Sequence, residues 1–245
     1  MPGHNVRLVL AFDGTAYSGW QIQKNRPTIQ GIVSEELHRI TNSPVRLKGS
    51  GRTDAGTHAR GLVANFLTDS AIPPARLVAA LNSRLPRDIR VLRARYAPLS
   101  FDAQKDARSK IYRYQIYTGP ILPPHLRREF FHFPFPIRIP EMERAARRFP
   151  GTHDFASFAK SPPGPNTVRQ ILACELRKRG RRLFLTVEGN GFLHHMVRNM
   201  AGTLLEIGRG SMSGADFENL FTERDRNLAG FTAPAHGLVL LKVKY

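Results

Sequence analysis

Cysteine is almost absent from this sequence. The single cysteine, Cys174, leaves no partner for an internal disulfide and no cluster for a cysteine-rich zinc site within one chain. Disulfide-stabilised secreted domains are therefore excluded as a class. Such cysteine usage fits a reducing compartment, and we expect the protein to be cytoplasmic.

Long apolar runs are missing as well. The first run, residues 8–12, is five residues long, whereas the core of a secretion signal needs about 7–15 apolar residues. No later run approaches the roughly 18–20 residues that cross a membrane. We expect neither a secretion signal nor a membrane partner.

Acidic residues are scarce relative to basic ones. The 245 residues contain 19 Asp and Glu against 37 Lys and Arg, which gives a net charge of +18, and only eight of the basic residues are lysine. Guanidinium groups pair with phosphates in a bidentate way and stack on bases. The balance favours a polyanionic partner, and the alternative is a basic protein without one.

Hydrophobic periodicity predicts alternating strands and helices in both halves of the chain. Alternation with period two predicts strands, spacing of three and four predicts helices, and Gly or Pro marks the turns. The predicted strands are 6–12, 62–67, 89–96, 111–117, 171–176, 183–187 and 238–243. The predicted helices are 29–40, 77–81, 142–149, 192–207 and 213–221, with an ordered loop over 120–136.

This order of elements predicts an α+β fold. We expect two similar domains, residues 1–103 and 104–245, each with a largely antiparallel sheet flanked by helices. The strands at 171–176 and 183–187 predict a hairpin whose turn, residues 177–182, reads RKRGRR and is strongly basic. Ser213 and Asp216 stand in the positions of a helix capping box.

The most unusual segment is 49–59, which reads GSGRTDAGTHA. Its three glycines allow tight turns and a close approach to a ligand. Asp54 is the one carboxylate in it, and Arg52, His58 and Arg60 surround it. In extended chain Arg52 and Asp54 point the same way, and the guanidinium favours the charged carboxylate. Such an aspartate suits a nucleophile or a base; the alternative is a turn with a local ion pair.

Two further segments carry candidate ligand-binding residues. Tyr112 lies in a strand where aromatic and basic residues interleave, a pattern that stacks bases and holds phosphates, although a core tyrosine fits equally well. Arg198, near the start of the helix expected at 192–207, can reach a carboxylate or a phosphate. His194 and His195 on that helix would point about 100° apart, which disfavours a shared metal. With no zinc or dinucleotide motif present, we expect no metal and no cofactor.

Segment 51–59 resembles the signature of the tRNA pseudouridine synthase A family. That signature more usually has valine at the position of Thr57. Further segments resemble the family in order, so the resemblance covers nearly the whole chain. They are 17–23 (YSGWQIQ), 28–31 (TIQG), 101–103 (FDA, often with histidine in the middle), 110–114 (KIYRY), 151–155 (GTHDF), 191–198 (GFLHHMVR) and 233–238 (APAHGL).

The resemblance implies an isomerase that converts uridine to pseudouridine in the anticodon stem and loop of tRNA, at tRNA positions 38, 39 and 40. It implies that Asp54 is the catalytic aspartate, that Tyr112 sits against the target base, that Arg198 pairs with Asp54, and that Arg52 helps to extrude the nucleotide. It also implies a homodimer with a basic active-site cleft between the two domains. Whether Asp54 attacks carbon or removes the C2′ proton stays open.

Two other functions remain compatible with these residues. One is a tRNA-binding or chaperone protein without turnover, which the joint presence of Asp54, Tyr112 and Arg198 disfavours. The other is a pseudouridine synthase that acts on a different RNA. Mapping modified uridines in cells with and without the gene separates all three.

Overall fold

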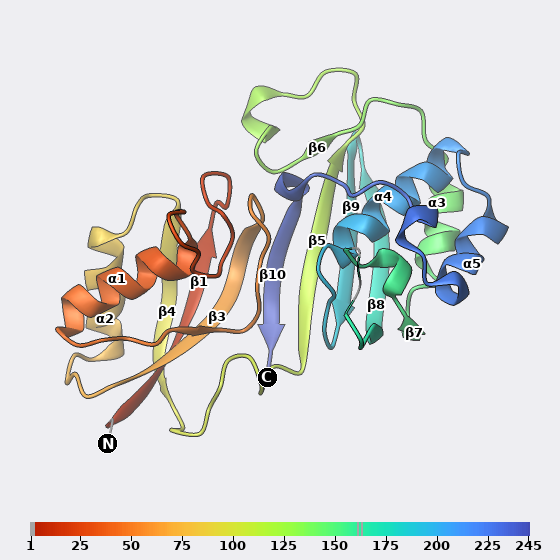
Figure 1. Cartoon of the computed structure of the whole chain (residues 1–245). Coiled ribbons are helices and arrows are strands. Elements are labelled where there is room, and N and C mark those ends of the chain that lie inside the picture. Colours follow the sequence, from red (N-terminus) through yellow and green to blue (C-terminus); the bar gives the residue numbers. More distant parts are fainter. Residues whose placement is uncertain (1–2, 161, 163) are drawn as a thin grey trace. The chain divides into compact units, whose positions relative to one another are not determined.

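The computed structural model describes residues 3–160, 162 and 164–245. The chain forms two compact units (Figure 1). Unit 1 runs to Arg108 and also contains Leu240–Tyr245, and unit 2 is Ser109–Val239. The sequence predicts a single boundary after residue 103, whereas the last residues of the chain return to unit 1.

Unit 1 is an antiparallel sheet with two helices. Its sheet has the order β4-β1-β3, with β10 beyond β3 and β2 paired to β3. The bounds are β1 His4–Phe12, α1 Ile29–Thr41, β2 Lys48–Gly49, β3 His58–Thr68, α2 Pro74–Arg84, β4 Ile89–Ala97 and β10 Leu238–Lys244, the last of which begins at the border between the units.

Alternation and helix capping explain the elements of unit 1. Val6, Leu8 and Leu10 of β1 are almost fully buried, as period-two alternation requires for a sheet covered on one face. The Thr28 hydroxyl accepts a hydrogen bond from the Gly31 backbone N–H at the start of α1. Such a cap satisfies a donor that the first turn of a helix leaves free.

Unit 2 contains four strands in the antiparallel order β5-β9-β8-β7, with helices α3, α4 and α5 (Figure 1). The two-residue strand β6 pairs with β5 in parallel. The bounds are β5 Ser109–Tyr117, η1 Pro124–Leu126, β6 Phe131–His132, α3 Ile139–Ala146, β7 Gly151–Asp154, η2 Ala156–Phe158, β8 Val168–Arg179, β9 Arg182–Gly189, α4 Met196–Arg209, α5 Gly214–Glu223, η3 Arg226–Leu228 and η4 Ala235–Gly237.

Aromatic packing and a helix cap stabilise unit 2. Phe149 lies within 5.3 Å of Phe158 and 5.4 Å of Phe217 between ring centroids, in edge-to-face contacts that aromatic rings prefer. At the start of α5, Ser213 and Asp216 form the predicted capping box. The α+β class with largely antiparallel sheets is confirmed.

The start of α4 differs from the sequence prediction. The helix begins at Met196 and not at residue 192, because His195 has a left-handed φ of 65° that an α-helix does not contain. The Met196 N–H bonds to the Leu193 carbonyl in a turn before the helix. None of the helices in the described part of the chain has the length and apolar character to cross a bilayer.

Candidate active site

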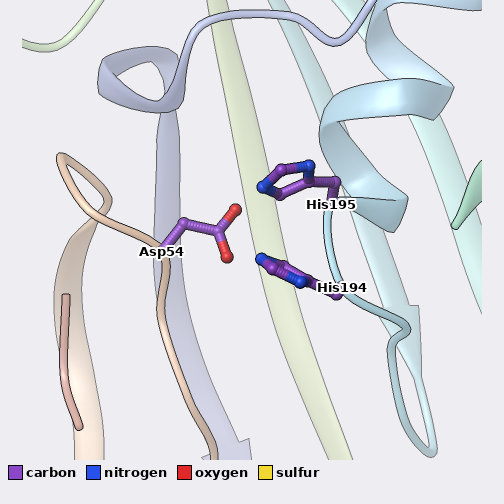
Figure 2. A group of neighbouring side chains, drawn as sticks. All are labelled: Asp54, His194 and His195. Atoms are coloured by element: carbon purple, nitrogen blue, oxygen red, sulfur yellow. The ribbon is translucent and has the colours of Figure 1, made fainter. Parts of the chain in front are cut away.

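Asp54 lies in the loop that joins β2 to β3 in unit 1 (Figure 2). Backbone hydrogen bonds fix the loop on both sides of it: the Trp20 N–H donates to the Thr53 carbonyl at 3.2 Å, and the Gly56 N–H donates to the Tyr17 carbonyl at 3.3 Å. Within the loop, the Thr57 N–H donates to the Asp54 carbonyl at 3.1 Å. The backbone that carries the carboxylate is therefore held in one conformation.

Two glycines outside the Asp54 segment allow residues 14–19 to lie directly against the backbone of the Asp54 loop. Gly19 has a φ of 87°, and a Cβ placed there would lie 2.3 Å from the Thr53 carbonyl oxygen. A Cβ at Gly14 would lie 2.1 Å from the carbonyl oxygen of Thr57. Only glycine fits both positions, since real Cβ atoms do not approach an oxygen so closely. Sequence reasoning missed these residues because nothing local shows that residues 13–20 contact the loop.

His58 holds the same two segments together. Its Nδ1 accepts a hydrogen bond from the Gly14 N–H at 3.1 Å and lies 3.2 Å from Asp13 Oδ1. Both contacts are made by one ring nitrogen, so His58 ties the turn at residues 13–14 to the end of the Asp54 loop. His58 is buried, which gives it a positioning role beside Asp54.

Arg52 and Asp54 share the accessible side of the loop. Arg52 is exposed and Asp54 half-buried, whereas Thr53 between them is buried. The alternation matches the expectation that the guanidinium and the carboxylate point the same way. A guanidinium and a carboxylate are thus both accessible on the same short segment. Arg60, also exposed, adds a second guanidinium nearby in the sequence.

Two threonine hydroxyls beside Asp54 are buried. Thr53 Oγ1 and Thr57 Oγ1 have no hydrogen-bond partner among the residues that the structure describes. A buried hydroxyl without a partner destabilises a fold by about 1–3 kcal/mol. In the sequence, Thr57 stood out only because the family signature more usually has valine there. Because Thr57 is buried, its extra hydroxyl lowers the stability of the fold.

Tyr112 lies on β5 in unit 2, opposite Val187 of β9. It is buried, and its ring meets Phe192 edge to face with 5.1 Å between centroids. Sequence reasoning left open a base-stacking platform and a core tyrosine. The ring packs within the fold of unit 2, and contact with a target base stays a prediction.

Arg198 lies in the first turn of α4 and is tied to Ala233. Its Nε donates to the Ala233 carbonyl at 2.7 Å, and the Ala233 N–H donates to the Arg198 carbonyl at 3.3 Å. Two segments that the sequence singled out separately, 191–198 and 233–238, therefore meet within unit 2. The pairing of Arg198 with Asp54 stays a prediction.

His194 and His195 do not stand on the helix. They precede α4, and their ring centroids are 4.1 Å apart (Figure 2). The expectation that helical geometry separates them by about 100° is wrong, because the left-handed backbone at His195 ends the turn before the helix starts. Their carbonyls are also used: His194 accepts from the Lys160 N–H and His195 from the Asn199 N–H.

Comparison with known proteins shows which family this chain resembles. A family model described as tRNA pseudouridine synthase matches residues 8–104 and 145–245. These ranges contain Arg52, Asp54 and Arg198, and Tyr112 falls between them. The tRNA pseudouridine synthase A of Pelobacter propionicus is 44% identical over 242 residues, 98% of this chain and 99% of that protein. That of Geotalea uraniireducens is 42% identical over 241 residues, with the same shares.

Proposed function

This chain belongs to the tRNA pseudouridine synthase family, and on that premise we propose that Asp54 is its catalytic residue. The protein isomerises uridine to pseudouridine in tRNA. In that reaction the N1–C1′ bond breaks, the base turns, and a C5–C1′ bond forms. The proton on C5 is lost and N1 ends with a proton, so the atoms balance without an oxidant or a reductant.

The geometry of the Asp54 loop carries this proposal. Hydrogen bonds at Thr53, Gly56 and Thr57 fix the backbone around Asp54, and its side chain stays half-buried. A carboxylate fixed before substrate binds loses little freedom on reaching the reactive geometry. It serves either as a nucleophile or as the base that removes the C2′ proton.

We propose the anticodon arm as the part of tRNA that is modified. A uridine must leave its stack before a carboxylate can reach the sugar, which costs a few kcal/mol. The net charge of +18 offers binding energy that offsets this cost. In this proposal Arg52, exposed beside Asp54, helps to extrude the nucleotide, Tyr112 lies against the base, and Arg198 pairs with Asp54.

We further propose a homodimer that works in the cytoplasm. The single cysteine, Cys174, fits a reducing compartment. Sedimentation of the purified protein, alone and with tRNA, measures the oligomeric state. A monomer in both samples contradicts the dimer and leaves the proposed role of Asp54 standing.

The test is Asp54→Asn. The amide keeps the size of the side chain and removes its charge and its nucleophilic oxygen. We expect pseudouridine formation, followed by tritium release from 5-tritiated uridine in tRNA, to disappear. Affinity for tRNA should persist or rise slightly, because a like charge near phosphate is lost.

Glu223→Gln is the matched control for Asp54→Asn. Glu223 is an exposed carboxylate at the end of α5, and its amide variant removes the same charge. It should retain normal activity. An Asp54→Asn protein that binds tRNA and still forms pseudouridine at a near-normal rate places the catalytic group elsewhere.

A further inference from the structure

The hairpin between β8 and β9 ends in a concentration of positive charge. Its turn is Gly180-Arg181, and Gly180 has a φ of 59°, as the first position of a two-residue type II′ turn requires. Every residue from 177 to 182 is exposed. The hairpin-end cluster consists of Arg127, Arg128, Lys178, Arg179, Arg181 and Arg182.

The two parts of the hairpin-end cluster are joined by aromatic contacts within unit 2. Arg182 lies 5.6 Å from the centroid of the Phe130 ring, and Phe130 lies 5.9 Å from Phe184 of β9. The Thr118 N–H donates to the Arg181 carbonyl at 2.8 Å. The loop after β5 and the β8–β9 turn therefore lie at the same end of the sheet (Figure 1).

Fold stability does not account for these charges. Arg177 is neutralised by Glu175 at 2.5 Å. Within the described part of the chain, Lys178, Arg179 and Arg181 form no ion pair. These three exposed cations lie within four residues and repel one another weakly, and an anion that binds them removes that repulsion. Arginine, with its bidentate fork, suits phosphate best.

We propose that the hairpin-end cluster binds the phosphate backbone of tRNA away from the reacting uridine. This proposal rests on the proposed function. Tyr117 pairs with Arg182 and Tyr112 with Val187 along the same two strands. Five residues of strand separate the cluster from Tyr112 by about 17 Å, at about 3.3 Å per residue. The cluster thus contacts RNA that the target base does not reach, and it contributes to affinity and not to chemistry.

The test compares two double variants that remove equal charge from unit 2. Arg179→Gln with Arg181→Gln alters the hairpin end. Arg144→Gln with Arg147→Gln alters α3 and its C-cap, where both arginines are also exposed and form no ion pair among the described residues. Affinity for full-length tRNA is titrated over a series of salt concentrations, and single-turnover pseudouridine formation is measured at saturating enzyme.

We expect the hairpin variant to bind tRNA several-fold more weakly. The slope of log affinity against log salt should fall by about 0.7–0.9 for each arginine lost. Its single-turnover rate at saturation should stay normal, the α3 variant should keep the original slope, and Arg179→Lys with Arg181→Lys should restore most of it.

Two outcomes overturn the inference. Equal slopes in the hairpin and α3 variants mean that the hairpin arginines act only through total charge. A lower single-turnover rate with unchanged affinity means that they affect the site and not binding. Neither result bears on the proposed catalytic role of Asp54, because the proposed function fails only if the Asp54→Asn protein still forms pseudouridine.

Discussion

At the scale of single residues, Asp54 is surrounded by side chains whose burial sets their contribution. Thr53 and Thr57 are buried on either side of it, and His58 is buried two positions beyond Gly56. Asp54 itself stays half-buried. The loop thus buries Thr53 and Thr57 and leaves the Asp54 carboxylate partly accessible, as a carboxylate that acts on a bound substrate requires.

Thr57→Val should stabilise the protein. Valine has the shape of threonine, and the substitution removes a buried hydroxyl that has no partner among the described residues. We expect the free energy of unfolding to rise by about 1 kcal/mol. Denaturant titration measures it, and Thr57→Ser is the control.

Thr57→Ser keeps the hydroxyl and loses the buried methyl group. It should lower the free energy of unfolding by about 1 kcal/mol. If Thr57→Val proves less stable than the original protein, the hydroxyl has a stabilising partner, and the energetic reading of this position is wrong.

Substitutions of Tyr112 distinguish a role of its ring from a role of its hydroxyl group. If the ring supports the target base, Tyr112→Phe should retain most turnover and Tyr112→Ala should lose it. If the hydroxyl transfers the C5 proton, both variants should be similarly inactive in a single-turnover assay. Full activity in both denies Tyr112 any role in the reaction.

Stability must be measured alongside the activity of both Tyr112 variants. Tyr112 is buried against Phe192, so Tyr112→Ala leaves a cavity that costs about 3–5 kcal/mol. Tyr112→Phe fills the same space. Activities are compared at a temperature where thermal unfolding shows both proteins folded.

At the scale of elements, the site depends on a contact between two loops. Residues 13–20 support the Asp54 loop through Gly14, Gly19 and the Tyr17 carbonyl. Tyr17 is fixed in turn, because its hydroxyl donates to Asp88 at 2.6 Å. Burial, with the Asp88 carboxylate next, raises the pKa of Tyr17 above its usual range. The position of Asp54 thus depends on a segment that lies about forty residues earlier in the sequence.

Gly19→Ala tests that contact. The new methyl group meets the Thr53 carbonyl oxygen, and alanine resists a φ of 87°. We expect the free energy of unfolding to fall by more than about 1 kcal/mol. Turnover should fall far more than tRNA affinity, because Asp54 moves while the basic surface stays.

Gly214→Ala is the matched control for Gly19→Ala. Gly214 opens α5, its φ is not in the left-handed range, and a Cβ there meets no atom within 4 Å. Its stability should stay the same or rise slightly, since alanine favours a helix more than glycine does. Equal behaviour of the two variants argues against tight packing at Gly19.

At the scale of the whole molecule, charge governs the encounter with RNA. The net charge of +18 predicts that tRNA affinity falls steeply with salt. The expected slope is about 0.7–0.9 log units of affinity per log unit of salt for each phosphate neutralised. Titration of tRNA binding from low to high salt measures it. A flat response removes the electrostatic basis of the proposed substrate contacts.

Local patterns in the sequence determined much of the fold and part of the site. Alternation in β1 and the capping box at Ser213 depend on neighbours within a few residues, and both are confirmed. These features are local because hydrogen bonds and side-chain direction repeat over short distances.

Tertiary structure alone decided which distant segments meet. The last strand returns to unit 1, where the Tyr245 hydroxyl donates to the Ala103 carbonyl at 2.7 Å. Gly14 and Gly19 meet the Asp54 loop, and Ala233 meets Arg198. The left-handed His195 delays the start of α4. The contacts between distant segments depend on polar groups finding partners far along the chain, and a hydrophobic pattern shows which face is buried but not against which segment it packs.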